Sequence, residues 1–107
     1  MDPNLPKTFQ DFIERFPNIE DAHANMAKAV ESIGPLDAKT MCLVKIGICA
    51  GAGLETATKS HVRRALENGA SPEEIEQAIL LAINTIGFPS AMAAWQWARM
   101  ILEPEEE

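Results

Sequence analysis

The sequence predicts an all-α protein of about six helices, and three observations support this. Ala, Ile, Leu, Met and Glu, which mostly favour helix, are abundant, whereas Tyr is absent and only 6% of the residues are aromatic. Apolar residues recur at intervals of three and four along most of the chain, as they do on one face of a helix. Glycine and proline separate these periodic segments, and none of the segments has a convincing strand pattern.

The first two helices are predicted over residues 5–16 and 19–33. Pro17 closes the first helix, and Asn18 is placed to cap the second, which ends before Gly34-Pro35. The first helix carries an apolar stripe of Leu5, Phe9, Phe12, Ile13 and Phe16. The second carries a stripe of Ile19, Ala22, Met26, Ala27, Val30 and Ile33. Both segments therefore read as amphipathic helices.

The third helix is predicted to follow a cap at Asp37 and to cover the stretch AKTMCLVKIGICAGAG, with Gly51 and Gly53 ending it. Its larger apolar side chains point in different directions: Met41, Leu43, Val44, Ile46 and Ile48. A helix that is apolar almost all round is typical of a segment surrounded by protein.

The fourth and fifth helices have clear boundary signals. The fourth runs from about Leu54 to Asn68-Gly69, where glycine suits the left-handed position after a helix. The fifth is capped by Ser71, with proline at the first helical position and Glu74 three residues after the cap, which is the pattern of a capping box. We expect this helix to continue to Ile86.

The C-terminal end of the chain carries the sixth helix. Gly87-Phe88-Pro89 breaks the fifth helix, and AMAAWQWARMIL forms the sixth before Pro104. Residues 103–107 form an acidic tail, and residues 1–107 are expected to form a single domain. Two of the helices carry more apolar surface than a 107-residue monomer can comfortably cover. We therefore expect a homo-oligomer, with the third, fifth and sixth helices as contact surfaces.

The charge distribution argues against nucleic acid and anionic membranes as partners. Nine basic and sixteen acidic residues give a net charge of -7, and four of the acids lie in the terminal EPEEE. No basic patch is available to contact phosphates. The N-terminus lacks the basic and apolar regions of a signal peptide, and no apolar run reaches membrane length, so we expect a cytoplasmic protein.

The sequence gives no reason to expect a metal or a cofactor. The two histidines, His23 and His61, belong to different segments, and no carboxylate cluster stands at ligand spacing. The GAG stretch at residues 51–53 follows a helix and not a strand, so it is not a phosphate-binding loop. Cys42 and Cys49 lie two helical turns apart, about 10.5 Å of rise, which is too far for a disulfide within one chain.

His61 and a group of neighbouring polar side chains are the candidate site residues. At 100° per residue, the residues within about 40° of His61 are Leu54, Ala57, Ala65 and Asn68. This places the imidazole at the centre of the inward stripe, with Arg64 at its edge. On the third helix Lys45 lies between Cys42 and Cys49. On so apolar a helix its charged end must extend to water, pair with an opposite charge or face a cavity. A structural interpretation competes, because a lone histidine or a free cysteine is more often a core residue.

The pattern over residues 37–101 resembles the carboxymuconolactone decarboxylase family, which includes the alkylhydroperoxidase D-like proteins. The most specific stretches are SHVRRALENGAS, in which His61 falls on the family histidine, and EEIEQAILLAINTIGFPSAM, which contains the Gly87-Phe88-Pro89 break. The resemblance implies an all-α, alkylhydroperoxidase D-like fold that assembles as trimers or hexamers. It also implies a site between the third and fourth helices near a subunit contact.

The sequence departs from the peroxidase branch of this family. Leu54 and Ala57 stand where that branch has its Cys-x-x-Cys pair, and Cys42 stands where it has an assisting carboxylate. The decarboxylase branch works without the cysteine pair, so the resemblance favours acid–base chemistry on a small lactone or carboxylic acid. His61 would then be the acid or base, and Arg64 or Lys45 would hold the substrate carboxylate.

Two other functions fit the same residues. A divergent, peroxiredoxin-type oxidoreductase could use Cys42 on a hydroperoxide, with Lys45 one turn away to favour the thiolate and His61 as the base. Alternatively, the chain is a non-catalytic oligomeric module that keeps the fold without the chemistry.

Overall fold

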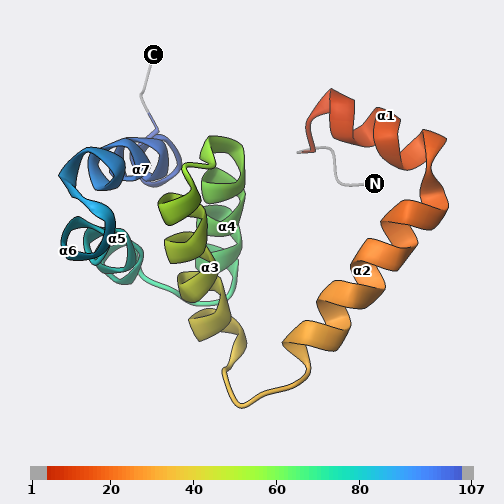
Figure 1. The fold of residues 1–107 in the computed structure, drawn as a ribbon, viewed down its shortest axis with the longest axis horizontal. Helices are drawn as coiled ribbons and strands as arrows, with labels where there is room; N and C mark the ends of the chain where they lie inside the picture. The colour runs from red at the N-terminus through yellow and green to blue at the C-terminus, as the bar shows by residue number, and fades with distance from the viewer. Residues whose placement is uncertain (1–4, 105–107) are drawn as a thin grey trace. The chain divides into compact units, whose positions relative to one another are not determined.

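The computed structural model describes residues 5–104, and all regular secondary structure in that range is helical (Figure 1). The helices are α1 (Lys7–Arg15), α2 (Pro17–Glu31), α3 (Ala38–Ala52), α4 (Glu55–Glu67), α5 (Pro72–Leu80), α6 (Ile83–Ile86) and α7 (Phe88–Leu102). The all-α prediction is therefore confirmed. The chain divides at Pro35 into two compact units, the first with α1 and α2 and the second with α3 to α7. The single domain over residues 1–107 stays a prediction.

The first unit is a pair of helices joined at Phe16-Pro17. Proline occupies the first position of α2 and Phe16 is its N-cap, so the predicted cap at Asn18 is wrong. The reason is that the fixed φ of Pro17 already suits a helix start, which leaves Asn18 inside the first turn. The Phe16 carbonyl accepts the backbone N–H of Ile19 and of Glu20, at 3.2 and 3.3 Å.

No residue of α1 or α2 is buried. We call the large apolar side chains that this unit exposes, including one just past α2, the apolar face of the first unit; they are Phe9, Phe12, Phe16, Ile19, Met26, Val30 and Ile33. A helical pair of this size with no core cannot draw its stability from its own packing.

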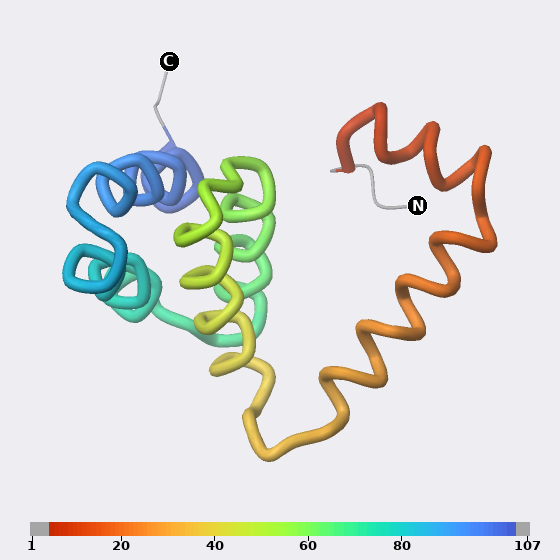
Figure 2. Tube along the Cα trace, in the orientation of Figure 1, coloured from red at the N-terminus to blue at the C-terminus, as the bar shows by residue number. Residues whose placement is uncertain are grey.

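The second unit contains the hydrophobic core. Its fully buried branched side chains come from α3, α4 and α5, and they are Ile46, Val62, Ile75 and Ile79. The remaining core positions are mostly alanines, with Ala94 and Ala98 on α7. α3 and α4 lie side by side, and α7 packs on α4 and α5 (Figure 2). Small side chains at these contacts let the helix axes approach closely.

α3 begins and ends close to the predicted positions. Asp37 caps it by accepting the backbone N–H of Thr40 at 2.8 Å, and Gly53 ends it in the left-handed region at φ +71°. Gly51 lies inside the helix and does not end it. Val44 is 46% and Ile48 64% exposed, so the helices of the second unit leave part of α3 uncovered. That protein surrounds this helix stays a prediction.

The predicted fifth helix is interrupted after Leu80. The chain turns at Leu81 and Ala82 before the short α6, and the Thr85 hydroxyl donates to the Leu81 carbonyl at 2.7 Å. A threonine that bonds back to the preceding turn often accompanies a bend in a helix. The backbone also changes to three-residue hydrogen bonds here, from the Ala82 N–H to the Ile79 carbonyl at 2.9 Å and from the Thr85 N–H to the Ala82 carbonyl at 3.1 Å. α7 then starts at Phe88, three residues earlier than the predicted segment, directly after Gly87 at φ +112°.

Candidate functional site

His61 lies on α4 at the edge of the buried stripe. The buried side chains of α4 are Thr58, Val62 and Ala65. The buried stripe is therefore centred beside His61, whereas the sequence analysis had placed its centre on His61. The imidazole is nevertheless half-buried, and its Nδ1 atom is shielded from solvent. It therefore presents one side to the protein and the other to the surface.

The Thr58 hydroxyl is fully buried one turn before His61. Over residues 5–104 no hydrogen-bond partner is found for its Oγ1 atom. Buried hydroxyl groups are nearly always hydrogen-bonded, so this oxygen is an exception among the buried polar atoms of the second unit. The sequence analysis did not single out Thr58, because threonine on the inner face of a helix carries no signal of its own.

Arg64 follows His61 by three residues on the same helix. Residues three apart are neighbours on a helix surface, about 5–6 Å between their Cβ atoms. The Arg64 side chain is exposed. Arg63 is exposed as well, but two residues of helix turn it about 160° away from His61. Of these two arginines, only Arg64 shares the histidine's side of α4.

Lys45 and Cys49 lie one turn apart on α3. Burial raises the pKa of the Cys49 thiol, and the positive charge of Lys45 acts in the opposite direction. Cys49 is 7% exposed, whereas Lys45 is half-buried. With burial the larger effect, Cys49 is held as a neutral thiol within the core.

Cys42 contacts the far end of α4. The Asn68 side-chain amide lies 3.8 Å from the Cys42 sulfur, and Asn68 follows His61 by seven residues. Seven residues of helix correspond to about 10.5 Å along its axis. The structure therefore brings His61 and Arg64 together on α4, and it places Cys42 beside Asn68, about two turns away from His61.

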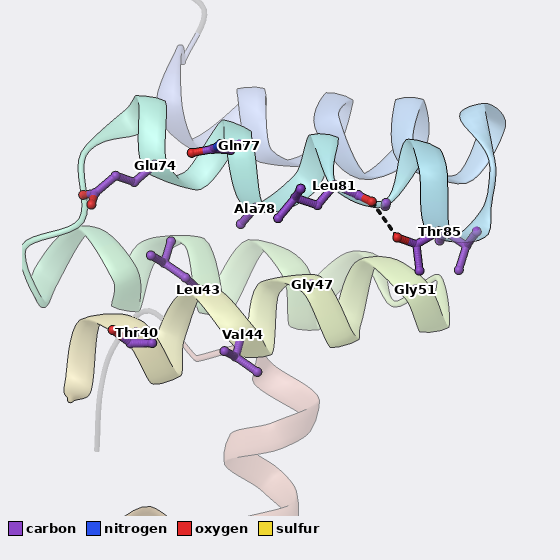
Figure 3. A pocket seen from close by; sticks show the side chains of 12 residues that line it. Thr40, Leu43, Val44, Gly47, Gly51, Glu74, Gln77, Ala78, Leu81 and Thr85 are labelled. Carbon is purple, nitrogen blue, oxygen red and sulfur yellow. Dashed lines mark hydrogen bonds between the residues drawn. The ribbon is translucent and has the colours of Figure 1, made fainter. Parts of the chain in front are cut away.

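A cavity of about 450 Å³ opens between α3 and the α5–α6 segment (Figure 3). Its α3 wall consists of Thr40, Leu43, Val44, Gly47 and Gly51. Its other wall consists of Glu74, Gln77, Ala78, Leu81, Ala82, Thr85 and Ile86. His61, Cys42, Lys45 and Arg64 are not among the lining residues.

The cavity and the predicted site residues lie on different flanks of α3. Leu43, Gly47 and Gly51 follow one another at four-residue spacing and share one flank, which faces α5 and α6. Cys42 and Lys45 lie on the flank turned about half a turn away from it. The sequence analysis missed this cavity. The signal that could have found it is Gly47, since a glycine in the middle of a helix costs stability and leaves the backbone uncovered; a Cβ atom added there would meet nothing within 4 Å.

Residues 5–104 contain no group of three His, Cys, Asp or Glu side chains that could hold a metal ion. None of the helices in this range is long and apolar enough to span a membrane.

Known proteins share both sequence and fold with this chain. The sequence model of the carboxymuconolactone decarboxylase family matches residues 17–100. An uncharacterized protein of Methanocaldococcus jannaschii is 33% identical over 78 residues, which cover 73% of this chain and 73% of that protein. The crystal structure of an apo carboxymuconolactone decarboxylase family protein from Legionella pneumophila has the same fold, with a TM-score of 0.80 at 22% identity over 90% of this chain and 86% of that one. The match over most of the chain shows that it belongs to the carboxymuconolactone decarboxylase family.

Proposed function

We propose that this family member acts on a small carboxylic acid or lactone by acid–base chemistry at His61. The observation that carries the proposal is the half-buried imidazole with the cationic Arg64 one turn along the same face of α4. Family membership supports a role of the carboxymuconolactone decarboxylase type. Histidine suits this role because both of its protonation states are populated near neutral pH.

The reaction needs three groups, and each has a candidate in this chain. Arg64 on α4, or Lys45 on the adjacent α3, would hold a carboxylate of the substrate. When the bond to the departing carboxylate breaks, carbon dioxide leaves and the electron pair stays on carbon, delocalised into the unsaturated ring as a dienolate. The protonated imidazole of His61 then gives its proton to that carbon and recovers one from water. An apolar environment at the departing carboxylate would favour its loss as neutral carbon dioxide.

The test compares the two histidines of the chain. His61→Ala and His61→Gln should abolish release of carbon dioxide from a carboxymuconolactone, while the matched control His23→Ala, on the exposed surface of α2, keeps the activity of the unaltered protein. Circular dichroism and thermal unfolding show whether each variant is folded. An active His61→Gln variant, or folded unaltered protein that turns over no member of a panel of small lactone acids, would refute the proposal.

A second candidate function is peroxide reduction at Cys42. The observation that favours Cys42 over Cys49 is access, because Cys42 is half-exposed and Cys49 is buried. The Cys42 thiolate would attack the O–O bond of a hydroperoxide, an alcohol would leave, and a sulfenic acid would form on the sulfur. An added low-molecular-weight thiol would have to reduce the sulfenic acid, since Cys49 lies two turns away in the core.

Trapping of the sulfenic acid separates the two candidates. If Cys42 is the nucleophile, dimedone labels it after treatment with a hydroperoxide, Cys42→Ser abolishes the label and Cys49→Ser keeps it. If neither reaction occurs in folded protein, the chain is a non-catalytic member of the family, which is the third function that the sequence allows.

A further inference from the structure

We propose that the Thr58 hydroxyl accepts a hydrogen bond from the Nδ1–H group of His61 and thereby fixes which imidazole nitrogen carries the reactive proton. Thr58 is a positioning residue in this proposal, because it acts on the substrate only through the histidine. The role of the proton rests on the function proposed above, whereas the hydrogen bond joins two residues of one helix. It does not depend on how the two units of the chain are arranged.

The Thr58 oxygen is a buried polar atom that needs a partner. The residue is fully buried, and within residues 5–104 no hydrogen-bond partner is found for its Oγ1 atom. A buried hydroxyl group left without a hydrogen bond destabilises the folded protein, which is why such atoms are rare. At a position used only for packing, valine would fill nearly the same space without this cost. The hydroxyl therefore points to a polar contact.

The helical neighbours of His61 leave Thr58 as its buried acceptor on α4. The residues three and four positions away from this histidine are Ala57, Thr58, Arg64 and Ala65. The two alanines carry no polar side-chain atom. Arg64 is exposed, and a guanidinium group can only donate hydrogen bonds. Among these four neighbours, Thr58 is therefore the one that offers a buried oxygen.

The direction of helical side chains brings the imidazole toward Thr58. Long side chains on an α-helix point back toward its N-terminus and lie over the residues three and four positions earlier. For His61 these are Ala57 and Thr58, and the Nδ1 atom of the ring is shielded from solvent. Cβ atoms three residues apart are about 5–6 Å from each other, which a histidine ring and a hydroxyl group can span.

Formation of the hydrogen bond requires a change of side-chain rotamer, since Oγ1 has no partner in this structure. Threonine in helices divides between two χ1 rotamers, which place the hydroxyl differently. Hydrogen bonds within catalytic sites are often long or poorly aligned without substrate and tighten when it binds. A hydroxyl group both donates and accepts, so Thr58 can donate to the Leu54 carbonyl, as helical threonine often does, and still accept from His61.

Cys49 on α3 is the competing acceptor. α3 and α4 are consecutive helices that lie side by side, and Cys42 on α3 contacts Asn68 on α4. Cys49 lies seven residues nearer to the connection between the helices than Cys42 does, and His61 lies seven residues nearer than Asn68. Cys49 and His61 are therefore at one level. Sulfur is a weak acceptor, and burial holds Cys49 as a neutral thiol, so the Thr58 oxygen is the better acceptor.

The proposed hydrogen bond leaves Nε2 as the nitrogen that exchanges the proton. When Nδ1–H is donated to Thr58, the neutral imidazole has its lone pair on Nε2. In the reaction proposed above, the Nε2–H group of the protonated ring gives its proton to the dienolate carbon. The ring is left as the Nδ1–H tautomer that Thr58 favours, and Nε2 then recovers a proton from water.

The tautomer of His61 tests the hydrogen bond directly, because it is measured without substrate. Nitrogen chemical shifts of the ring in 15N-labelled protein, at a pH where the imidazole is neutral, should show the Nδ1–H form. Thr58→Val removes the acceptor and should move His61 to the mixture of tautomers that the exposed His23 shows in the same spectrum. Thr58→Ser keeps a hydroxyl group and should keep the Nδ1–H form.

The matched control is Thr56→Val on the same helix. Thr56 is exposed and lies about 140° around α4 from His61, so its substitution should leave the ring shifts unchanged. In turnover, Thr58→Val should lower kcat by about tenfold with KM unchanged, and Thr58→Ser should keep most of the activity. Circular dichroism and thermal unfolding show whether each variant is folded.

The unaltered protein alone can overturn the proposal, since an Nε2–H tautomer at His61 contradicts it even if Thr58→Val fails to fold. A tautomer that does not change in folded Thr58→Val would also overturn it, and a change in Cys49→Ala instead would assign the acceptor to the thiol. A tautomer that depends on Thr58 in protein that turns over no lactone acid would support the hydrogen bond and refute the proposed function. Active protein whose tautomer ignores Thr58→Val would refute the hydrogen bond alone.

Discussion

The Asn68 side-chain nitrogen lies 3.8 Å from the Cys42 sulfur and donates to the Arg64 carbonyl at 2.8 Å. This pair joins the beginning of α3 to the end of α4. Its consequence is that the accessible thiol and the half-buried imidazole of His61 lie at different levels of the same helix pair, about 10.5 Å apart along α4. Cys42 and His61 therefore belong to separate local environments, and the acid–base proposal does not depend on either cysteine.

The two thiols should react at very different rates. Because burial raises the pKa of Cys49 and shields its sulfur, iodoacetamide at neutral pH should modify Cys42 at least about tenfold faster than Cys49. Peptide mass spectrometry over time measures both rates in one sample, with Cys42→Ser and Cys49→Ser as controls for assignment. Equal rates in folded protein would contradict the burial of Cys49.

The capping box at the start of α5 should contribute measurably to stability. Ser71 Oγ accepts the Glu74 backbone N–H at 3.1 Å, and the Glu74 carboxylate accepts the Ser71 backbone N–H. Ser71→Ala removes an acceptor at the helix end and should lower the free energy of unfolding by about 1 kcal/mol. Urea unfolding measures the loss. Ser71→Asp keeps an acceptor and should remain close to the unaltered protein; an equal loss in both variants would attribute the effect to something other than the cap.

Stability should fall in acid because two carboxylates have lowered pKa values. Hydrogen bonds from the side chain and backbone of Thr40 lower the pKa of Asp37, and those from the Ser71 backbone and the Lys39 side chain lower that of Glu74. A folded pKa below the unfolded one means that the unfolded chain binds protons first as the pH falls. The stabilisation is therefore present above the ordinary carboxyl range, about pH 4, and is lost as the pH falls through the lowered values.

The double variant Asp37→Asn, Glu74→Gln isolates this effect. Both amides keep an acceptor oxygen at the helix ends but do not titrate in acid. Thermal unfolding between about pH 6 and pH 2 should show a shallower loss of Tm in the double variant than in the unaltered protein. Parallel curves would mean that other groups govern the acid sensitivity.

Features set by residues close together in the sequence, such as helix caps, were predictable, whereas features set by tertiary packing were not. Ser71 was identifiable as a cap because its partner lies three residues away, whereas Asn18 failed because Pro17 had already started the helix. The break after Leu80 was missed because the residues around it favour helix or fit a helical stripe. Thr85, whose hydroxyl bonds to the Leu81 carbonyl near the break, does not mark a helix end in the sequence.

The register of α4 shows the same limit for the site. The helical pattern placed His61 on the inner half of α4 correctly, but the packing of α3 and α7 decides that Val62 and Ala65 take the buried centre. For the cavity between α3 and α5–α6 the sequence offers one local signal, Gly47. That Gly47 and Leu81 come to line the same cavity depends on tertiary packing, which no periodicity within either segment encodes.

Arg64 should affect substrate binding where Arg63 does not. If Arg64 holds the substrate carboxylate, Arg64→Ala removes a charge-assisted hydrogen bond worth about 1.5–3 kcal/mol and should raise KM by roughly 10- to 100-fold with a smaller change in kcat. Arg63→Ala removes the same charge from the opposite side of α4 and should leave KM unchanged. Steady-state kinetics on the carboxymuconolactone substrate measures both. An unchanged KM in Arg64→Ala together with a raised KM in Lys45→Met would show that Lys45 on α3, and not Arg64, holds the substrate carboxylate. If Arg64→Ala and Arg63→Ala raised KM equally, both arginines would act only by general electrostatic attraction of the substrate.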